Sequence, residues 1–207
     1  VFLGASCMYP KNSKQPFKES TILDGKVEKT NEGYGIAKIL GTKLVEFMNI
    51  QHDRKYISII PAASYGPNDC YDEKINHVIP ALIQKFHNAK VNKNKYVEVW
   101  GTGNARREFL HVDDMASGIV FLLENYYENS PINLGTGEEI SIKELAKLVA
   151  KVTNFKGKIS FDKSKPDGIP RKILNSKKIQ SLGWKPSISL IDGLKKTYKI
   201  YLDNIKK

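Results

Sequence analysis

The sequence predicts an α/β protein built around a parallel β-sheet. Short apolar runs alternate along the 207 residues with segments of helical periodicity, which is the order of elements in parallel α/β folds. The run at residues 55–61, with Tyr56, Ile57, Ile59 and Ile60, suits a strand that is covered on both faces. A hydrophobic content of 41% and this chain length suffice to bury a sizeable core, in one large domain or two small ones.

The first half of the chain is expected to alternate strand and helix around a long loop. Residues recur at helical spacing between about Asn31 and Asn49, and the loop before this segment contains Pro10 and Pro16. The expected order is a strand at 1–4, the loop, a helix at 31–49, a strand at 55–61, a turn at 64–69 and a helix at 77–87.

Capping signals place the helices of the second half. Asp113 or Asp114 is expected to cap a helix that continues through Leu123. Ser141, with Glu144 three residues later, forms a capping box at the start of another helix. The remaining expected elements are strands at 96–100, 107–112, 131–134 and 158–161 and helices near 176–182 and 190–205.

The charge of the chain is strongly basic but comes mainly from lysine. The formal net charge is +11, and the only arginines are Arg54, Arg106, Arg107 and Arg171. Nucleic-acid-binding proteins usually use arginine forks, and no recognition motif is present, so we expect no nucleic-acid partner. Two interpretations of the lysines stay open: a solvated surface, or attraction of an anionic substrate or cofactor.

We expect no membrane segment, no metal site and no disulfide framework. No stretch is apolar for long enough to span a bilayer, and no charged-then-apolar signal segment opens the chain. Cys7 and Cys70 are the only cysteines, and the four histidines lack ligand spacing. This usage of cysteine fits a reducing cytoplasm.

The glycine-rich phosphate loop of dinucleotide-binding folds is absent from the sequence. The Gly-Thr-Gly turns at 101–103 and 135–137 lack the third glycine of Gly-x-Gly-x-x-Gly. The chain also opens on Val-Phe-Leu-Gly at 1–4, which is typical of the middle of a buried strand. We therefore expect that an N-terminal part is missing from this chain.

Tyr34 and Lys38 form the most informative pair in the chain. Four residues apart on the predicted helix, they lie on one face. The ammonium group of Lys38 is then expected to favour the phenolate of Tyr34 and to lower its pKa, so that the tyrosine exchanges a proton near neutral pH. The pair is a weak signal alone, but it lies between Cys-Met-Tyr-Pro at 7–10 and Tyr-Gly-Pro at 65–67.

Together these motifs resemble the extended short-chain dehydrogenase/reductase family and, within it, the GDP-L-fucose synthases. The specific stretches are Cys-x-Tyr-Pro at 7–10 and His-Val-Ile-Pro-Ala at 77–81. The resemblance covers nearly the whole chain, with further matches at 2–11, 34–38, 65–67, 77–82, 99–101, 107–115, 165–168 and 182–184.

The resemblance implies two domains. Residues 1–74 correspond to the C-terminal part of a Rossmann-type, doubly wound parallel sheet that binds NADP(H). Residues 75–207 correspond mainly to a smaller α/β domain that binds the substrate, with some segments returning to the Rossmann sheet. The glycine-rich loop and most of the adenosine site are then expected in the missing N-terminal part.

The resemblance also implies an enzyme that converts GDP-4-keto-6-deoxy-D-mannose to GDP-L-fucose. The C3 and C5 centres are epimerised first, and NADPH then reduces the C4 keto group. Proton removal falls to Cys7, proton return to His77 and protonation of the C4 oxygen to Tyr34, with Lys38 stabilising the phenolate.

One catalytic position departs from the family pattern. The serine that polarises the C4 carbonyl falls on Ala5, which has no hydroxyl group. Ser6 is its neighbour, but adjacent residues of a strand point to opposite faces. Either a loop lets Ser6 substitute, or backbone donors and Tyr34 polarise the carbonyl alone.

Ligand contacts are assigned by resemblance as well. The GDP-sugar is expected to contact Lys85, Trp100, Arg107 and Asp167, with guanine on Trp100 and diphosphate on Arg107. A homodimer is expected to form through helices that include the one with Tyr34. The residues expected near NADP(H) are Leu3, Gly4, Ala5, Ser6, Tyr34, Lys38, Pro61, Ala62, Ala63, Ser64 and His77.

Alternatives stay open at the level of function and of single residues. One alternative is another nucleotide-sugar epimerase, dehydratase or reductase, and the presence of Cys7 and His77 argues against it. The other alternative is a catalytically impaired sugar-nucleotide-binding protein, which Ala5 favours. Cys7 is otherwise an inert core cysteine, and Trp100 a buried core residue. His111 is expected only to satisfy local backbone groups.

Overall fold

The computed structural model describes residues 1–72 and 76–205, and it is an α/β protein as predicted. The chain divides into two compact units, which are described separately. Unit 1 comprises Val1–Ser64, Glu108–Glu139 and Arg171–Ser187, and unit 2 comprises Tyr65–Arg107, Ile140–Pro170 and Ile188–Lys207. The expected domain boundary between residues 74 and 75 lies outside the described residues.

A three-stranded parallel sheet forms the centre of unit 1. Strands β1 (Phe2–Leu3), β2 (Ser58–Pro61) and β7 (Ile132–Leu134) are ordered β1-β2-β7. The predicted strands at the start of the chain, at 55–61 and at 131–134 are therefore present, each slightly shorter than expected. Burial of β2 up to Ile60 and of all of β7 explains the apolar residues of both strands. Ile59, Ile60, Ile132 and Leu134 have no exposed surface, and neither does the polar Asn133.

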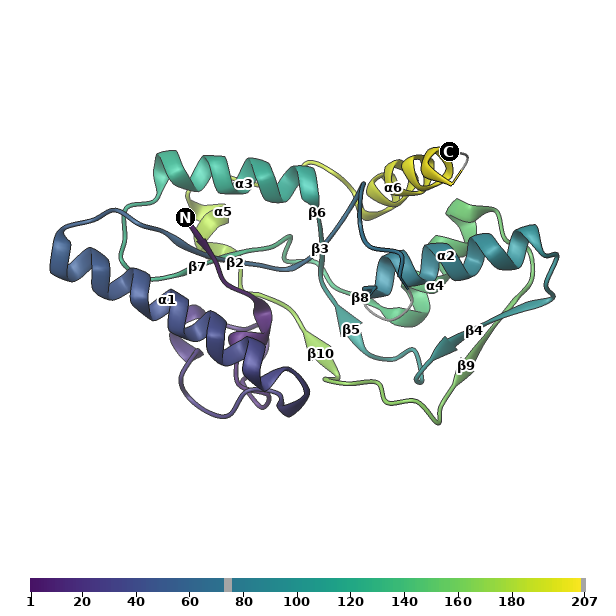
Figure 1. Ribbon diagram of the computed structural model, residues 1–207, viewed down its shortest axis with the longest axis horizontal. Coiled ribbons are helices and arrows are strands. Elements are labelled where there is room, and N and C mark those ends of the chain that lie inside the picture. Colours follow the sequence, from purple (N-terminus) through teal and green to yellow (C-terminus); the bar gives the residue numbers. More distant parts are fainter. Residues whose placement is uncertain (73–75, 206–207) are drawn as a thin grey trace. The chain divides into compact units, whose positions relative to one another are not determined.

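Two long helices flank this sheet. Figure 1 shows β2 and β7 running between α1 (Glu32–His52) and α3 (Val112–Asn125). Leu122 of α3 is fully buried in the core with the strand residues, and Ile39 of α1 packs against the same core. Unit 1 also contains α5 (Lys177–Ser181), which packs on β7, and the shorter elements η1 (Ser6–Met8), η2 (Glu19–Thr21), η3 (Lys29–Asn31), β6 (Phe109–His111) and β10 (Arg171–Lys172).

Two glycines let α1 approach its neighbours closely. A Cβ atom added at Gly41 would overlap the ring of Phe2 in β1. A Cβ atom added at Gly35 would lie 2.9 Å from the carbonyl oxygen of Cys7 in η1. The helix that carries Tyr34 therefore packs directly on the strand end and on the turn that follows it.

The start of α3 differs from the expectation. The N-cap residue is His111, whose Nδ1 accepts a hydrogen bond from the backbone N–H of Asp113 at 3.2 Å. Asp114 is buried instead, and its Oδ1 accepts hydrogen bonds from the backbone N–H and the hydroxyl group of Ser187 at 3.1 and 2.8 Å. The prediction that His111 satisfies local backbone is confirmed, and the prediction of an aspartate cap is wrong.

The described residues of unit 2 form helices and short paired strands. Strand β4 (Tyr96–Trp100) pairs in parallel with β9 (Lys158–Asp162), and the two strands correspond to those expected at 96–100 and 158–161. The region expected as one strand at 107–112 is divided, and its first part, β5 (Arg106–Arg107), pairs antiparallel with β8 (Ile140–Ser141). One further short strand, β3 (Ala63–Tyr65), spans the junction between the units.

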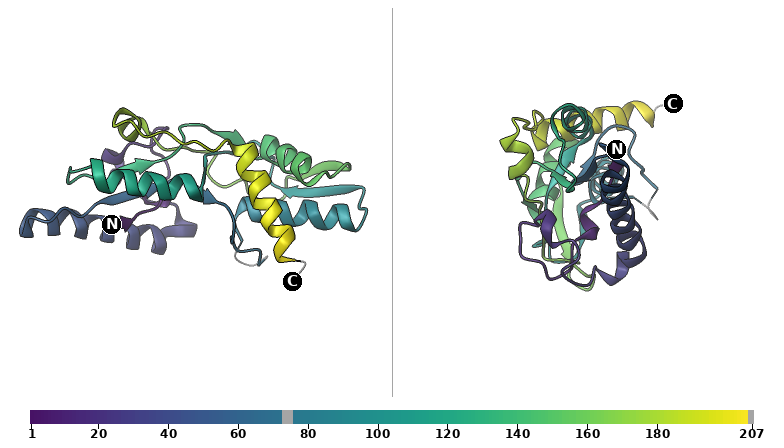
Figure 2. Two further views of the ribbon diagram at one scale, coloured as in Figure 1. Left: turned by 90° about the horizontal axis from the view of Figure 1, so that it is seen from above. Right: turned by 90° about the vertical axis from the view of Figure 1, so that its left-hand side faces the viewer.

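The helices of unit 2 pack around α4. They are α2 (Val78–Val91), α4 (Ile142–Thr153) and α6 (Leu190–Asn204), and Figure 2 shows α6, in yellow, running crosswise to α4. The predicted capping box is confirmed: the Glu144 backbone N–H donates to Ser141 Oγ at 3.2 Å, and the Ser141 backbone N–H donates to Glu144 Oε2 at 2.9 Å.

Candidate functional site

The first group of candidate residues lies in unit 1, at the carboxyl end of β1. Lys38 Nζ donates a hydrogen bond to the carbonyl oxygen of Leu3 at 2.9 Å and lies 5.5 Å from the centroid of the Tyr34 ring. The helical spacing predicted for the pair is therefore confirmed. The Tyr34 side chain is 56% exposed, so its phenol is accessible to a ligand.

The pKa of Tyr34 does not follow the expectation. Partial burial and the neighbouring Cys7 raise the pKa of Tyr34 above its ordinary value, and Lys38 does not lower it. The Lys38 ammonium group donates to the Leu3 carbonyl and faces the Tyr34 ring, and burial of the phenol sets the direction of the shift. The prediction that Lys38 tunes Tyr34 toward neutral pH is wrong for the chain by itself.

Cys7 belongs to the same group of residues. It is half-buried in η1, and burial raises its pKa above the ordinary value of 9.0, although the positive charges of Lys172 and Lys38 act in the opposite direction. The direction of this pKa shift is the opposite of the one that the sequence predicted. Desolvation outweighs the two ammonium groups.

Ser6 does not lie on a strand. Strand β1 ends at Leu3, and η1 begins at Ser6, so the alternation of faces that separated Ser6 from Ala5 does not apply. The Ala5 backbone N–H points at the sulfur of Met8, 3.3 Å away. Among the described residues, the Ser6 hydroxyl has no hydrogen-bond partner, which leaves it available as a donor to a ligand.

The end of β2 completes this edge of the sheet. The backbone N–H of Gly4 donates to the carbonyl oxygen of Ile59 at 2.8 Å, and that of Ala62 donates to Leu134 at 2.9 Å. Ala62 is buried, whereas Ala63 and Ser64 are exposed. Open parallel sheets bind dinucleotides at the carboxyl ends of their strands. The Lys38 ammonium group uses one of its three N–H donors on the Leu3 carbonyl, which leaves two N–H donors for a ribose hydroxyl. These residues fit the nicotinamide half of NADP(H).

The second group of candidates lies in unit 2, around Trp100. The indole is 64% exposed, with Lys85 Nζ at 5.4 Å and Lys165 Nζ at 5.6 Å from its ring centroid. The interpretation of Trp100 as a core residue is therefore wrong. Lys165 was not among the predicted site residues, although its place two residues before Asp167 in a matching stretch was a signal for it.

Asp167 holds the turn that follows Trp100. Its carboxylate accepts hydrogen bonds from the backbone N–H of Thr102 at 2.7 Å and from the Thr102 hydroxyl at 2.6 Å, and these bonds lower the pKa of Asp167. Arg107 Nη2 donates to the backbone carbonyl of Asp167 at 3.2 Å, and burial lowers the pKa of Arg107. Both side chains are thus engaged with this turn.

The candidate residues divide between the units. Unit 1 brings together Tyr34, Lys38 and Cys7. Unit 2 contains the four substrate candidates and His77, which is exposed at the N-cap of α2 and makes no capping hydrogen bond. Within residues 1–72 and 76–205, no three His, Cys, Asp or Glu side chains are grouped so that they would hold a metal ion, and none of the helices has the length and apolarity to cross a membrane.

Comparison with known proteins places this geometry in a family. Residues 1–135 match the family described as "NAD dependent epimerase/dehydratase family". The chain is 51% identical over 205 residues to GDP-L-fucose synthase 1 of Arabidopsis thaliana, and this alignment covers 99% of the chain and 64% of that protein. It spans 62% to 66% of the length of this and four other curated GDP-L-fucose synthases.

Solved structures of related proteins superpose closely on this chain. A GDP-6-OMe-4-keto-L-xylo-heptose reductase from Campylobacter jejuni superposes with a TM-score of 0.92 at 34% identity, over 99% of this chain and 70% of that one. A GDP-L-fucose synthetase from Naegleria fowleri bound to NADP superposes with a TM-score of 0.93 at 27% identity, over 99% and 66%. The chain is a homologue of the GDP-L-fucose synthases and belongs to the NAD dependent epimerase/dehydratase family.

Proposed function

We propose that the protein containing this chain converts GDP-4-keto-6-deoxy-D-mannose to GDP-L-fucose, by epimerisation at C3 and C5 followed by NADPH-dependent reduction at C4. The observation that carries the proposal is the grouping of Tyr34, Lys38 and Cys7 at the carboxyl end of β1. A phenol, an ammonium group and a thiol at this edge supply a proton donor, a hydroxyl-binding cation and a base.

Epimerisation requires proton transfer on two faces of the sugar. In our proposal, Cys7 Sγ removes the acidic protons at C3 and C5, and His77 returns a proton from the opposite face. The raised pKa of Cys7 makes its thiolate scarce at neutral pH. The developing negative charge on the C4 oxygen must therefore be stabilised as the thiolate forms, and Ser6 and Tyr34 are the donors that we assign to that oxygen.

Reduction uses the same edge of the sheet. When bound, NADPH supplies a hydride to C4. Tyr34 Oη donates its proton to the C4 oxygen, and Lys38 Nζ, held by the Leu3 carbonyl, binds a ribose hydroxyl of the cofactor and orients it. Burial and the neighbouring Cys7 raise the pKa of Tyr34, so the phenol keeps its proton until negative charge develops on the C4 oxygen and accepts it.

The GDP part of the substrate is assigned to unit 2. The exposed indole of Trp100 offers a stacking surface for guanine, and Lys85 and Lys165 provide positive charge beside it. Arg107 is assigned to the diphosphate. In this proposal Asp167 acts by holding the turn at 101–103, and a contact of its remaining lone pairs with the substrate is compatible with that role.

The proposal is tested by separating the two half-reactions. Incubating the protein with GDP-4-keto-6-deoxy-D-mannose in deuterated water, without NADPH, measures deuterium wash-in at C3 and C5. We expect Cys7→Ser to stop wash-in and Cys70→Ser, which changes the exposed cysteine, to leave it unchanged. Wash-in by Cys7→Ser at the unsubstituted rate would refute the role of Cys7.

The same assay distinguishes a second function, which Ala5 favours. A catalytically impaired sugar-nucleotide-binding protein would bind GDP-sugars in a Trp100-dependent manner but would show neither wash-in nor NADPH oxidation. Ala5→Ser would then be expected to restore activity, because a single oxyanion donor is worth on the order of a hundredfold in rate.

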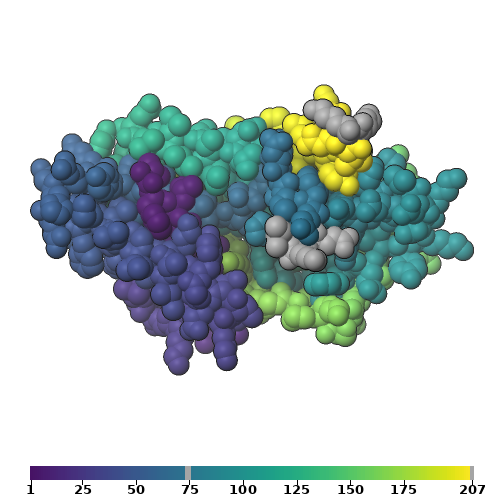
Figure 3. All heavy atoms as spheres, in the orientation of Figure 1, coloured from purple at the N-terminus to yellow at the C-terminus, as the bar shows by residue number. Residues whose placement is uncertain are grey.

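We also propose that the protein is a homodimer through α1. Apolar side chains recur on this helix at the spacing of one face, and five of them are more than half exposed: Ile36, Leu40, Leu44, Phe47 and Ile50. The residues of α1 form part of the surface seen in Figure 3, where they are coloured dark blue. An exposed apolar stripe of this length favours a partner.

A further inference from the structure

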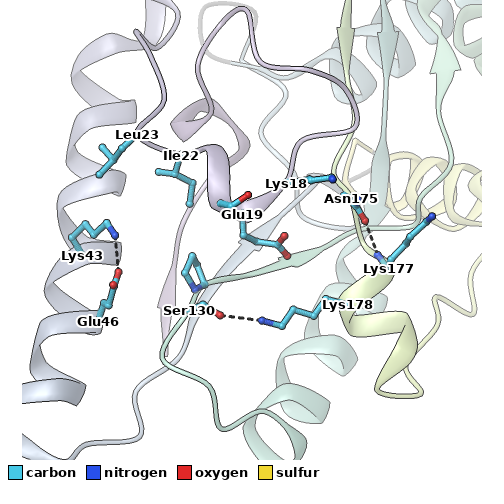
Figure 4. A pocket seen from close by; sticks show the side chains of 12 residues that line it. Lys18, Glu19, Ile22, Leu23, Lys43, Glu46, Ser130, Asn175, Lys177 and Lys178 are labelled. Atoms are coloured by element: carbon cyan, nitrogen blue, oxygen red, sulfur yellow. Dashed lines mark hydrogen bonds and ion pairs between the residues drawn. The ribbon is translucent and has the colours of Figure 1, made fainter.

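Unit 1 contains a pocket that lies apart from the residues assigned to the cofactor. Its volume is about 580 Å³, within the range of small-molecule sites. The walls come from residues 18–23, from α1, from the two residues before β7 and from the start of α5 (Figure 4). Ser130 and Pro131 immediately precede β7, so the pocket lies at the amino-terminal edge of the sheet. The dinucleotide residues follow the carboxyl ends of β1 and β2.

The pocket is positively charged. Four lysines and two glutamates line it, which gives two net positive charges. Neither glutamate is without a partner: Glu19 Oε1 accepts the backbone N–H of Asn133 at 2.9 Å, and Glu46 pairs with Lys43 at 2.8 Å. Lys43 and Glu46 offset each other, so the remaining charge of the lining comes from Lys18, Lys177, Lys178 and Glu19.

Two of the lysines are available to a ligand. Lys178 Nζ is engaged with Glu128 at 2.7 Å and with the Tyr126 hydroxyl at 2.8 Å. Lys18 and Lys177 are exposed, and neither has a carboxylate within ion-pair distance among residues 1–72 and 76–205. Figure 4 shows both on the side of the pocket opposite α1.

The side of the pocket toward α1 combines apolar side chains with the ion pair of Lys43 and Glu46. Ile22 and Leu23 lie toward α1 in Figure 4, and Pro131 adds a third apolar surface. Leu23 is 63% exposed, which leaves its side chain open to contact. One wall thus suits an anionic group and the other suits an organic body.

We propose that this pocket binds a small phosphate monoester, with the phosphate on Lys18 and Lys177 and the organic part on Ile22, Leu23 and Pro131. A phosphate monoester carries about −1.5 to −2 charges at pH 7, and Lys18 and Lys177 are the two lining lysines that have no carboxylate partner among the described residues. Lysine ammonium groups bind phosphate as point charges and tolerate the irregular geometry of such a pocket. This inference does not depend on the proposed reaction.

Titration calorimetry with inorganic phosphate and with phenyl phosphate tests the inference. We expect saturable binding with a dissociation constant of roughly 1 mM or tighter, with phenyl phosphate the tighter ligand. Lys18→Ala combined with Lys177→Ala is expected to weaken both ligands about tenfold. Leu23→Ala is expected to weaken phenyl phosphate about threefold and to leave inorganic phosphate unchanged.

A control variant removes the same charge elsewhere. Lys156 and Lys199 are exposed lysines of unit 2, and replacing both with alanine also lowers the net charge by two. We expect this variant to bind both ligands as the unsubstituted protein does. Equal weakening in the two double variants, or no saturable binding, would overturn the proposal.

Discussion

Replacing Gly41 with alanine tests how closely α1 packs on β1. Alanine is favoured over glycine in a helix interior by about 1 kcal/mol. A methyl group at this position would overlap the Phe2 ring, and overpacking of this kind costs about 1–3 kcal/mol. We therefore expect the Gly41→Ala protein to range from nearly neutral to about 2 kcal/mol less stable than the unsubstituted protein.

Gly33 of the same helix provides a matched control. A Cβ atom at Gly33 would have no neighbour within 4 Å, so Gly33→Ala gains helix propensity, up to about 1 kcal/mol, without a clash. The free energies of unfolding of the two variants should differ by about 1–3 kcal/mol. The cost of Gly41→Ala should also fall when Phe2 is replaced by leucine, since the two positions are in contact.

Urea denaturation measures these differences. Trp184 is 7% exposed in unit 1, so its fluorescence reports the unfolding of the unit that contains α1, whereas Trp100 is already exposed. If Gly41→Ala is as stable as Gly33→Ala, or if Phe2→Leu has no effect on the difference, the packing argument is refuted.

Three further outcomes follow from the site. Since the pKa of Cys7 is raised, its thiol keeps its proton to higher pH, and the initial rate of deuterium wash-in should rise about tenfold per pH unit from pH 7 to 9. Lys172→Met should move this profile to still higher pH, because it removes a positive charge that lowers the pKa of Cys7. A flat profile would contradict the role of Cys7. Trp100→Ala should raise the dissociation constant for GDP at least about tenfold in calorimetry, while Tyr96→Ala on the same strand should not. Leu40→Lys with Leu44→Lys should yield a monomer in light scattering, and an unchanged mass would argue against the α1 interface.

Much of the fold was predictable because its signals are local. The Ser141 capping box, the apolar run of β2 and the helical spacing of Tyr34 and Lys38 each depend on residues a few positions apart. The start of α3 was not predictable in this way. The Asp114 carboxylate accepts a hydrogen bond from Ser187, which is far along the chain, and the imidazole of His111 caps the helix instead.

Residue types at the site were easier to predict than their electrostatics. The placement of Lys38 on the same face as Tyr34 follows from the helix, but the pKa of Tyr34 depends on how much of the phenol is buried and on the neighbouring Cys7. The exposure of Trp100 likewise depends on the elements around β4 and not on its own sequence. The pocket that we propose for a phosphate monoester had no signal in the sequence, because its lining comes from separate stretches of chain.

The contact between Gly35 and the Cys7 carbonyl has a consequence for how two chemical steps share one location. The turn with the thiol packs on the helix with the phenol, and a side chain at position 35 would push the two apart. In the reaction that we propose, the thiol and the phenol act on the same sugar in succession, so their spacing matters to both events. Widening this contact should therefore uncouple inversion from hydride capture.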